Sequence, residues 1–181
     1  MKNRIVAFLL LSVNVALARP AIITQTDIHT VAENHPKVFL GGSLITPWRD
    51  RLITLLRDTN YTLYNPAHPE IPGRIEWEQS HIEKADILLM WIAKNTPRDS
   101  YTLSLTSLFE LGRFIEMEGK TLIVGIDPDY AMHEELTLQL RRLRPELTIF
   151  DSIDSLAASL KKHWQSRTKS SLASAHQQAS S

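Results

Sequence analysis

Short apolar runs alternate with amphipathic stretches over most of the chain, and this alternation predicts strands separated by helices. The apolar run in Asp86–Ile92 is unbroken after its first residue, as is typical of a strand in the middle of a parallel sheet. The predicted strands are Lys37–Leu40, Tyr61–Tyr64, Asp86–Ile92, Thr121–Val124 and Leu147–Phe150. The predicted helices are Pro47–Leu56, Arg74–Ala85, one that contains Glu110, and one from Asp151 to about Trp164.

Strands that alternate with helices imply right-handed crossovers, so we expect a single α/β domain with a doubly wound, mostly parallel, five-stranded sheet. In such sheets ligands bind beyond the carboxyl ends of the strands. The distinctive polar motifs all fall at that edge, although loops lie there in any such fold. They are Gly41-Gly42-Ser43, Asn65-Pro66, the loop after Ile92, and Gly125–Tyr130.

The two ends of the chain differ from its middle. Lys2 and Arg4 precede a short apolar run, and Ala16-Leu-Ala18 offers the small residues of a cleavage site. This pattern predicts a secretory signal peptide cleaved after Ala18, and hence a secreted or periplasmic protein. An N-terminal strand or an uncleaved anchor are the alternatives. We divide the chain into a signal peptide (1–18), an N-terminal extension (19–36), a folded domain (37–165) and a flexible tail (166–181).

Composition removes several classes of function. Lysine and arginine number 20 and aspartate and glutamate also number 20, so no net field favours nucleic acid or a membrane surface as a partner. The chain has no cysteine, which excludes disulfides, thiolate catalysis and cysteine-based zinc sites. His133-Glu-Glu lacks the spacing of a zinc-binding helix. We therefore expect neither a metal nor a cofactor, and a small-molecule ligand.

Glu110 is the carboxylate that the sequence places most distinctively. It lies within about two turns of the start of a helix whose apolar face is formed by Leu108, Leu111 and Phe114. The positive end of the helix dipole is expected to keep Glu110 ionised, as a nucleophile must be. A different interpretation is equally simple: Ser107-x-x-Glu110 is also a capping box, in which the glutamate only satisfies a backbone N–H.

Glu78 and the glycine pair are the other candidates for chemistry. Glu78, near the start of the preceding helix, either faces the same edge as Glu110 or is an ordinary solvated side chain. Gly41-Gly42-Ser43 offers N–H groups and a hydroxyl to a sugar or phosphate, or forms a plain tight turn. Asp86 opens the central strand, where a carboxylate more simply bonds the backbone.

A set of short motifs, in order, resembles the nucleoside 2-deoxyribosyltransferase-like family over about residues 37 to 150. The motifs are Phe39-Leu-Gly-Gly-Ser43, Trp48-Arg49, Asn65-Pro66, Trp77-Glu78, Ala85-Asp86, Ser104-x-Thr106, Phe109-Glu-Leu-Gly-Arg113 and Val124-Gly-x-Asp-Pro128. The resemblance implies a flavodoxin-like fold and cleavage of the N-glycosidic bond of a nucleoside or nucleotide. It further implies that Glu110 is the nucleophile on the anomeric carbon and that Glu78 handles the leaving base and its proton.

The chain departs from the family at two positions. Ser104 stands where the transferases usually carry an aspartate, and Phe39 stands where an aromatic hydroxyl is common. Sites in this family are often completed by a neighbouring subunit, so a homo-oligomer is possible, although we find no convincing match for the completing residue. The departures leave open a hydrolase instead of a base-exchanging transferase. They also leave open a non-catalytic nucleotide-binding or sensing domain and a secreted NAD- or nucleotide-degrading effector.

The predicted site therefore combines two carboxylates with a small set of binding residues. Glu110 and Glu78 are expected about 5 Å apart, as in retaining glycosidases. Gly41, Gly42 and Ser43 would hold the sugar or a 5′-phosphate, and Asn65 would add a hydrogen bond. Trp77 or Trp91 would form a wall for the base, and the family motifs add Phe39, Trp48 and Ser104 to the residues near the substrate.

Overall fold

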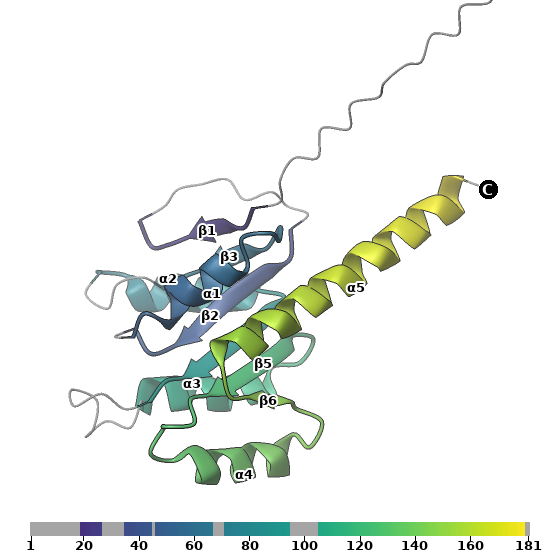
Figure 1. Ribbon diagram of the computed structural model, residues 1–181. Helices are drawn as coiled ribbons and strands as arrows, with labels where there is room; N and C mark the ends of the chain where they lie inside the picture. Colours follow the sequence, from purple (N-terminus) through teal and green to yellow (C-terminus); the bar gives the residue numbers. More distant parts are fainter. Residues whose placement is uncertain (1–18, 27–34, 45, 67–70, 95–104, 180–181) are drawn as a thin grey trace, which may run out of the picture.

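The computed structural model describes residues 19–26, 35–44, 46–66, 71–94 and 105–179, with side chains up to residue 166. Six strands form one sheet in the order β1-β3-β2-β4-β5-β6, and every neighbouring pair is parallel (Figure 1). The strands are β1 (Ala21–Ile23), β2 (Lys37–Gly42), β3 (Thr62–Tyr64), β4 (Ile87–Ile92), β5 (Thr121–Ile126) and β6 (Ile149–Phe150).

Helices cover both faces of the sheet. They are α1 (Trp48–Leu55), α2 (Arg74–Lys84), α3 (Leu105–Glu116), α4 (His133–Leu143) and α5 (Ile153–Ala179). One core cluster joins α1 and α5 to the sheet, and a second joins α2, α3 and α4 to the opposite face. All six residues of β4 are buried, and alternate ones face the two clusters, which explains its unbroken apolar sequence.

The predicted doubly wound α/β fold is confirmed. Apart from β1, the strand order β3-β2-β4-β5-β6 follows the flavodoxin-like pattern. In this pattern the second strand is added on one side of the first, and all later strands are added on the other side. Here that switch point lies between β2 and β4, which pair from Val38↔Ile87 to Gly42↔Trp91. Ligands of such folds bind in the crevice beyond the carboxyl ends of these two strands.

Three elements differ from the sequence-based expectation. The sheet has six strands instead of five, because β1 lies inside the segment predicted as an N-terminal extension and pairs with β3. The helix α4 was not predicted. The backbone of α5 is helical to Ala179, where a flexible tail was expected. The proposed signal peptide lies outside the described residues.

Asp86 behaves as the sequence suggested. Its Oδ2 accepts a hydrogen bond of 2.7 Å from the backbone N–H of Lys37, at the amino-terminal ends of β4 and β2, opposite the edge where ligands of such folds bind. The carboxylate thus ties the start of β4 to the start of β2. No helix in the described part of the chain is both long and apolar enough to cross a membrane.

The glycines at the end of β2 are required by packing. The strand includes both of them, so they form no simple turn. Gly42 has a φ of 123°, and a Cβ there would lie 2.2 Å from the carbonyl oxygen of Trp91. At Gly112 in α3, by contrast, a Cβ would meet nothing within 4 Å. Gly42 lets β2 and β4 approach each other closely at the switch point, whereas Gly112 only weakens α3.

These two glycines give a matched pair of substitutions. G42A should lower the free energy of unfolding by roughly 2 kcal/mol or more, because the methyl group meets fixed backbone and a left-handed φ. G112A should raise it by about 0.5–1 kcal/mol through helix propensity alone. Urea unfolding followed by circular dichroism measures both, and a G42A protein as stable as wild type would contradict this account of the switch point.

Candidate active site

Two acidic residues, on the neighbouring helices α2 and α3, lie close enough for their charges to interact. Glu78 is the fifth residue of α2, and Glu110 is the sixth residue of α3. The negative charge of Glu78 contributes to raising the pKa of Glu110, which requires the two side chains to lie near each other. The two acids that the sequence singled out therefore influence each other electrostatically.

Burial is the main influence on Glu110. It raises the pKa of this carboxyl, with a smaller contribution from Glu78, to about 7, although Arg49, Arg74 and Arg113 act in the opposite direction. The expectation that the helix dipole keeps Glu110 ionised is thus wrong for the free protein, in which much of it carries a proton at neutral pH. Within the described residues its carboxyl group forms no hydrogen bond or ion pair.

The capping-box interpretation of Glu110 is also wrong. A capping box needs Ser107 at the position before the first helical residue. The helix α3 already includes Leu105, so Ser107 lies inside it, and its side chain is buried. Glu110 therefore has no role at the helix terminus that would explain its position.

Arg74 fixes Glu78 in place. One guanidinium nitrogen of Arg74, Nη1, donates to both carboxylate oxygens of Glu78, at 2.8 and 2.9 Å. The pair spans one helical turn, and the Glu78 residue is only 5% exposed. A buried carboxylate needs such a partner, because an unpaired buried charge is strongly destabilising.

Arg49 binds the backbone of the Gly41-Gly42-Ser43 segment. Its buried guanidinium donates to the carbonyl oxygens of Leu40 (3.1 and 3.0 Å), Gly42 (2.8 Å) and Ser43 (2.6 Å). The indole Nε1 of Trp48 also donates to the Ser43 oxygen, at 3.0 Å. Together these bonds hold the carboxyl end of β2 in one conformation.

The charge of Arg49 also acts on the acids. Burial lowers its pKa to about 9, and Glu110 and Glu78 oppose that decrease. The guanidinium therefore stays protonated at neutral pH and supplies a fixed positive charge beside the two carboxyl groups. Within the part of the chain that the structure describes, Arg49 forms no ion pair with a carboxylate.

Asn65 and Trp77 are the predicted binding residues that are not committed to the core. The backbone N–H of Asn65 donates to Ile23 at 2.8 Å, but its side-chain Oδ1 is buried without a hydrogen-bond partner in the described structure. Such an oxygen is costly unless a donor reaches it. Trp77 is half-buried and stacks on His81, with ring centroids 4.0 Å apart.

Three other predicted binding residues lie in the core. Phe39 is 1% exposed and packs edge-on against Phe114, so it supports the site from behind. Trp48 is buried and holds Ser43 and Arg49 in place. Trp91 is buried on the α1–α5 face, so the expectation that it forms a wall for a base beside Glu110 is wrong. Ser104 lies outside the described residues.

The arginines were not recognised as site residues from the sequence. Arg74 and Arg113 lie four residues before Glu78 and three residues after Glu110, spacings that place side chains on one face of a helix. That signal could have found them. Arg113 also donates to the Oε1 of Gln79 at 2.8 Å, which links α3 to α2.

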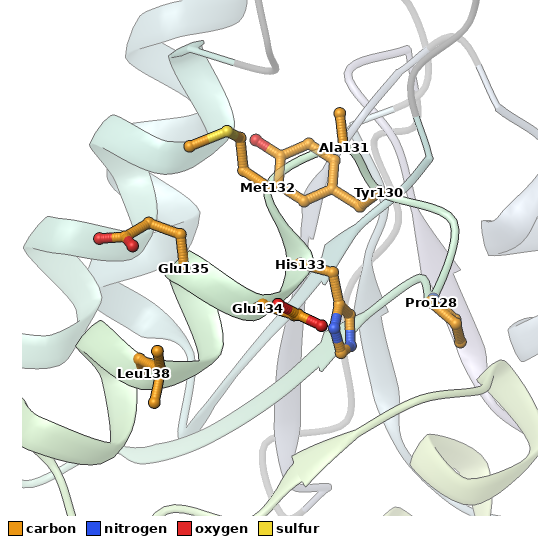
Figure 2. A pocket seen from close by; sticks show the side chains of 8 residues that line it. All are labelled: Pro128, Tyr130, Ala131, Met132, His133, Glu134, Glu135 and Leu138. Atoms are coloured by element: carbon orange, nitrogen blue, oxygen red, sulfur yellow. The ribbon is translucent and has the colours of Figure 1, made fainter.

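Two surface hollows of about 510 Å³ each lie outside this site. One lies over the loop before α4 and its first turns (Figure 2). The other lies on the outer side of α3, around Gly112 and Phe109. Among the described residues, no cluster of histidine, aspartate or glutamate side chains could hold a metal ion.

The fold and the site together define a flavodoxin-like α/β protein in which two acids interact with each other and with Arg49 at the carboxyl end of β2. A sequence model of the family described as "Nucleoside 2-deoxyribosyltransferase like" matches residues 35–130, more than half of the chain. The chain therefore belongs to this family, as the motifs suggested. The matched region includes Glu78 and Glu110. No curated protein was matched when the chain was compared with curated sequences.

The shared space of the two acids can be tested by titration. E78Q removes one cause of the raised pKa of Glu110, so that pKa should fall from about 7 toward the ordinary value of 4.5 while burial keeps part of the shift. NMR of side-chain carboxyl carbons in ¹³C-glutamate-labelled protein measures it directly. E76Q, at an exposed position of the same helix, should leave the pKa of Glu110 unchanged. An unaltered value in E78Q would show that the acids are not neighbours.

Proposed function

We propose that this protein cleaves the N-glycosidic bond of a nucleoside or nucleotide, with Glu110 as the nucleophile and a glycosyl-enzyme intermediate. The observation that supports this most directly is that Glu78 and the buried Arg49 both act on the charge of Glu110. Membership in the family supports nucleoside glycosyl transfer as the general class of reaction. The roles of individual residues follow from the chemistry that each side chain can perform.

The reaction proceeds in two displacements. In the first, a carboxylate oxygen of Glu110 bonds to C1′ as the bond from C1′ to the base nitrogen breaks, and the base leaves with a proton. In the second, water or an acceptor base attacks C1′, the bond from C1′ to Glu110 breaks, and the nucleophile gives up a proton that replaces the one taken by the departing base. Because Arg74 pairs with Glu78, we assign Glu78 to holding the water that carries the proton to the departing base.

Ionised Glu110 should be less costly in the transition state of the reaction than in the empty site. Burial makes an ionised Glu110 costly when nothing lies against it, which is why its pKa is raised. Positive charge that develops on the sugar at C1′ would offset that cost. The arginines limit the penalty, so that a useful fraction of Glu110 is ionised near neutral pH.

The binding residues divide between sugar and base. The segment Gly41-Gly42-Ser43, held by Arg49, presents the end of β2 to the sugar or a 5′-phosphate. The unpartnered Oδ1 of Asn65 would accept a hydrogen bond from a sugar hydroxyl or a base amino group. Trp77 offers an aromatic surface to the base. No step of this scheme requires a cofactor.

E110Q tests the nucleophile. Base release should fall by roughly a thousandfold or more, because the amide cannot form the glycosyl-enzyme. E110A should fail in the same way. E116Q, at an exposed position in the last turn of α3, should retain wild-type turnover. In the wild type, kcat/KM should rise with pH through about 7, as Glu110 loses its proton.

E110Q should also change the pH dependence of the free energy of unfolding, which distinguishes it from a variant that is merely misfolded. The pKa of Glu110 in the folded state lies above its ordinary value of 4.5, so the folded protein loses stability as pH rises from about 4.5 through about 7. E110Q removes this loss and should raise the free energy of unfolding above pH 7 by roughly 1–3 kcal/mol, with little effect at pH 4. A folded E110Q with unchanged turnover would refute the catalytic role.

A panel of substrates separates this function from its alternatives. The purified protein is incubated with ribonucleosides, deoxyribonucleosides, monophosphates and NAD, with and without an acceptor base, and free base is measured by chromatography. Release without an acceptor indicates a hydrolase, and release only with one indicates a transferase. Binding without any release would favour the nucleotide-binding domain that Ser104 in place of an acid suggests, and a preference for NAD would favour the effector.

We also propose that the protein is exported and cleaved after Ala18. Support comes from the N-terminal sequence pattern and from the position of β1, which begins at Ala21, so cleavage would leave every described strand intact. Intact mass of the protein expressed with its leader should match a chain that begins at Arg19. A mass that retains residues 1–18 would contradict the proposal.

A further inference from the structure

An arginine of α3 is bonded to α2 through a neutral side chain. Nη1 of Arg113 donates to Oε1 of Gln79 at 2.8 Å. Both residues are half-buried, so the bond is only partly open to water. Gln79 directly follows Glu78 in the sequence, and Arg113 lies three residues after Glu110 on α3. The bond therefore joins the two helices that carry the acids, close to each acid along its own helix.

The hydrogen bond determines where the charge of Arg113 lies. Residues three apart on a helix are neighbours on its surface, with Cβ atoms about 5–6 Å apart, so Arg113 starts near Glu110. From that position a long arginine side chain could still turn away into solvent. The bond to Gln79 opposes this, because it ties the guanidinium to the helix from which Glu78 also acts on Glu110.

Arg113 keeps its full charge because Gln79 is an amide. In the part of the chain that the structure describes, Arg113 forms no ion pair, whereas Arg74 is paired with the carboxylate of Glu78. Glu116 lies three residues after Arg113 on α3, but it is exposed and does not pair with the arginine. A cation held by a neutral group exerts more of its field on a nearby carboxyl group than a cation that is already paired.

The charged groups that act on Glu110 come from three helices. They are Glu78 and Arg74 of α2, Arg49 of α1 and Arg113 of α3. Burial and the neighbouring acid raise the pKa of Glu110 to about 7, and the three arginines act to lower it. Arg49 is held by backbone carbonyl oxygens and Arg74 by an acid, whereas Arg113 is held by Gln79. A change at this glutamine can therefore alter the field at Glu110 without removing any of the charged groups.

We propose that Gln79 is a positioning residue, which holds the unneutralised guanidinium of Arg113 near Glu110 and so favours the ionised nucleophile. This role rests on the proposed function of Glu110, and Gln79 acts only through Arg113. The simpler alternative is that the hydrogen bond only ties α2 to α3. The two explanations differ in what happens to Glu110 when the bond is lost, because a tie between helices would leave its protonation unchanged.

Titration of Glu110 tests the proposal without any substrate. Q79M keeps the length of the side chain and removes its acceptor, so Arg113 is released and the pKa of Glu110 should rise from about 7 by about half a unit or more. R113M removes the cation and should raise this pKa at least as far. NMR of the carboxyl carbons in ¹³C-glutamate-labelled protein measures both. Q139M removes an amide that bonds Glu135 within α4 at 2.9 Å, and it should leave the value unchanged.

A double variant separates positioning from packing. In R113M, the further change Q79M should not move the pKa of Glu110, because the glutamine acts only through the arginine. Q79E keeps an acceptor for Arg113 but neutralises its charge, so it should raise the pKa of Glu110 further than Q79M does. It also provides a test if Q79M fails to fold. Additive effects of Q79M and R113M, or a wild-type pKa of Glu110 in Q79E, would overturn the proposal.

The pH dependence of base release reports the same effect in the reaction. In Q79M the rise of kcat/KM should move to higher pH by the same interval as the titration of Glu110. The rate should then be about threefold lower near pH 6 and close to wild type above about pH 8.5. A Q79M rate that is lowered equally at every pH would contradict the proposal. If no nucleoside releases its base, the proposed function fails, whereas the titration still decides whether Gln79 positions Arg113.

Discussion

The guanidinium of Arg49 is the interaction on which the site depends. It is buried at the junction of α1 and the end of β2, and it donates hydrogen bonds to backbone carbonyl oxygens. A charge in that position is tolerated only because fixed dipoles surround it and two acids lie nearby. The segment that would contact a sugar is therefore held by the same group whose charge helps to lower the pKa of Glu110 against the effect of burial.

The position of Glu110 lowers the stability of the folded protein when this carboxyl group is ionised. A half-buried carboxyl beside a second acid is poorly solvated, and its raised pKa reports that cost. Nothing in the described structure offers it a hydrogen bond in return. Sites that act on charged transition states commonly accept such a penalty, because the bound reactant supplies the missing interaction. The arrangement has no evident structural purpose otherwise.

The sequence predicted the sheet well because its central strands are apolar without interruption. The same feature gives no indication of which face of the sheet each side chain lies on. Because β4 is buried on both faces, Trp91 could not be assigned to the α1–α5 face without the register. The strand β1 was missed because three residues carry too little pattern. The helix α4 was missed because only Leu140 of its residues is buried. The arginines were missed because charged residues on a helix usually lie in solvent.

The hydrogen bond from Asn65 to Ile23 gives the first strand an importance that its length conceals. Asn65 follows β3, and the carbonyl at the end of β1 holds its backbone. Proteolytic trimming beyond Ile23 would thus do more than shorten the chain, since it would release the peptide group that carries the unpartnered amide oxygen. Cleavage after Ala18, as proposed, would keep this hydrogen bond, whereas a cut after Ile23 would leave the backbone of Asn65 without its anchor.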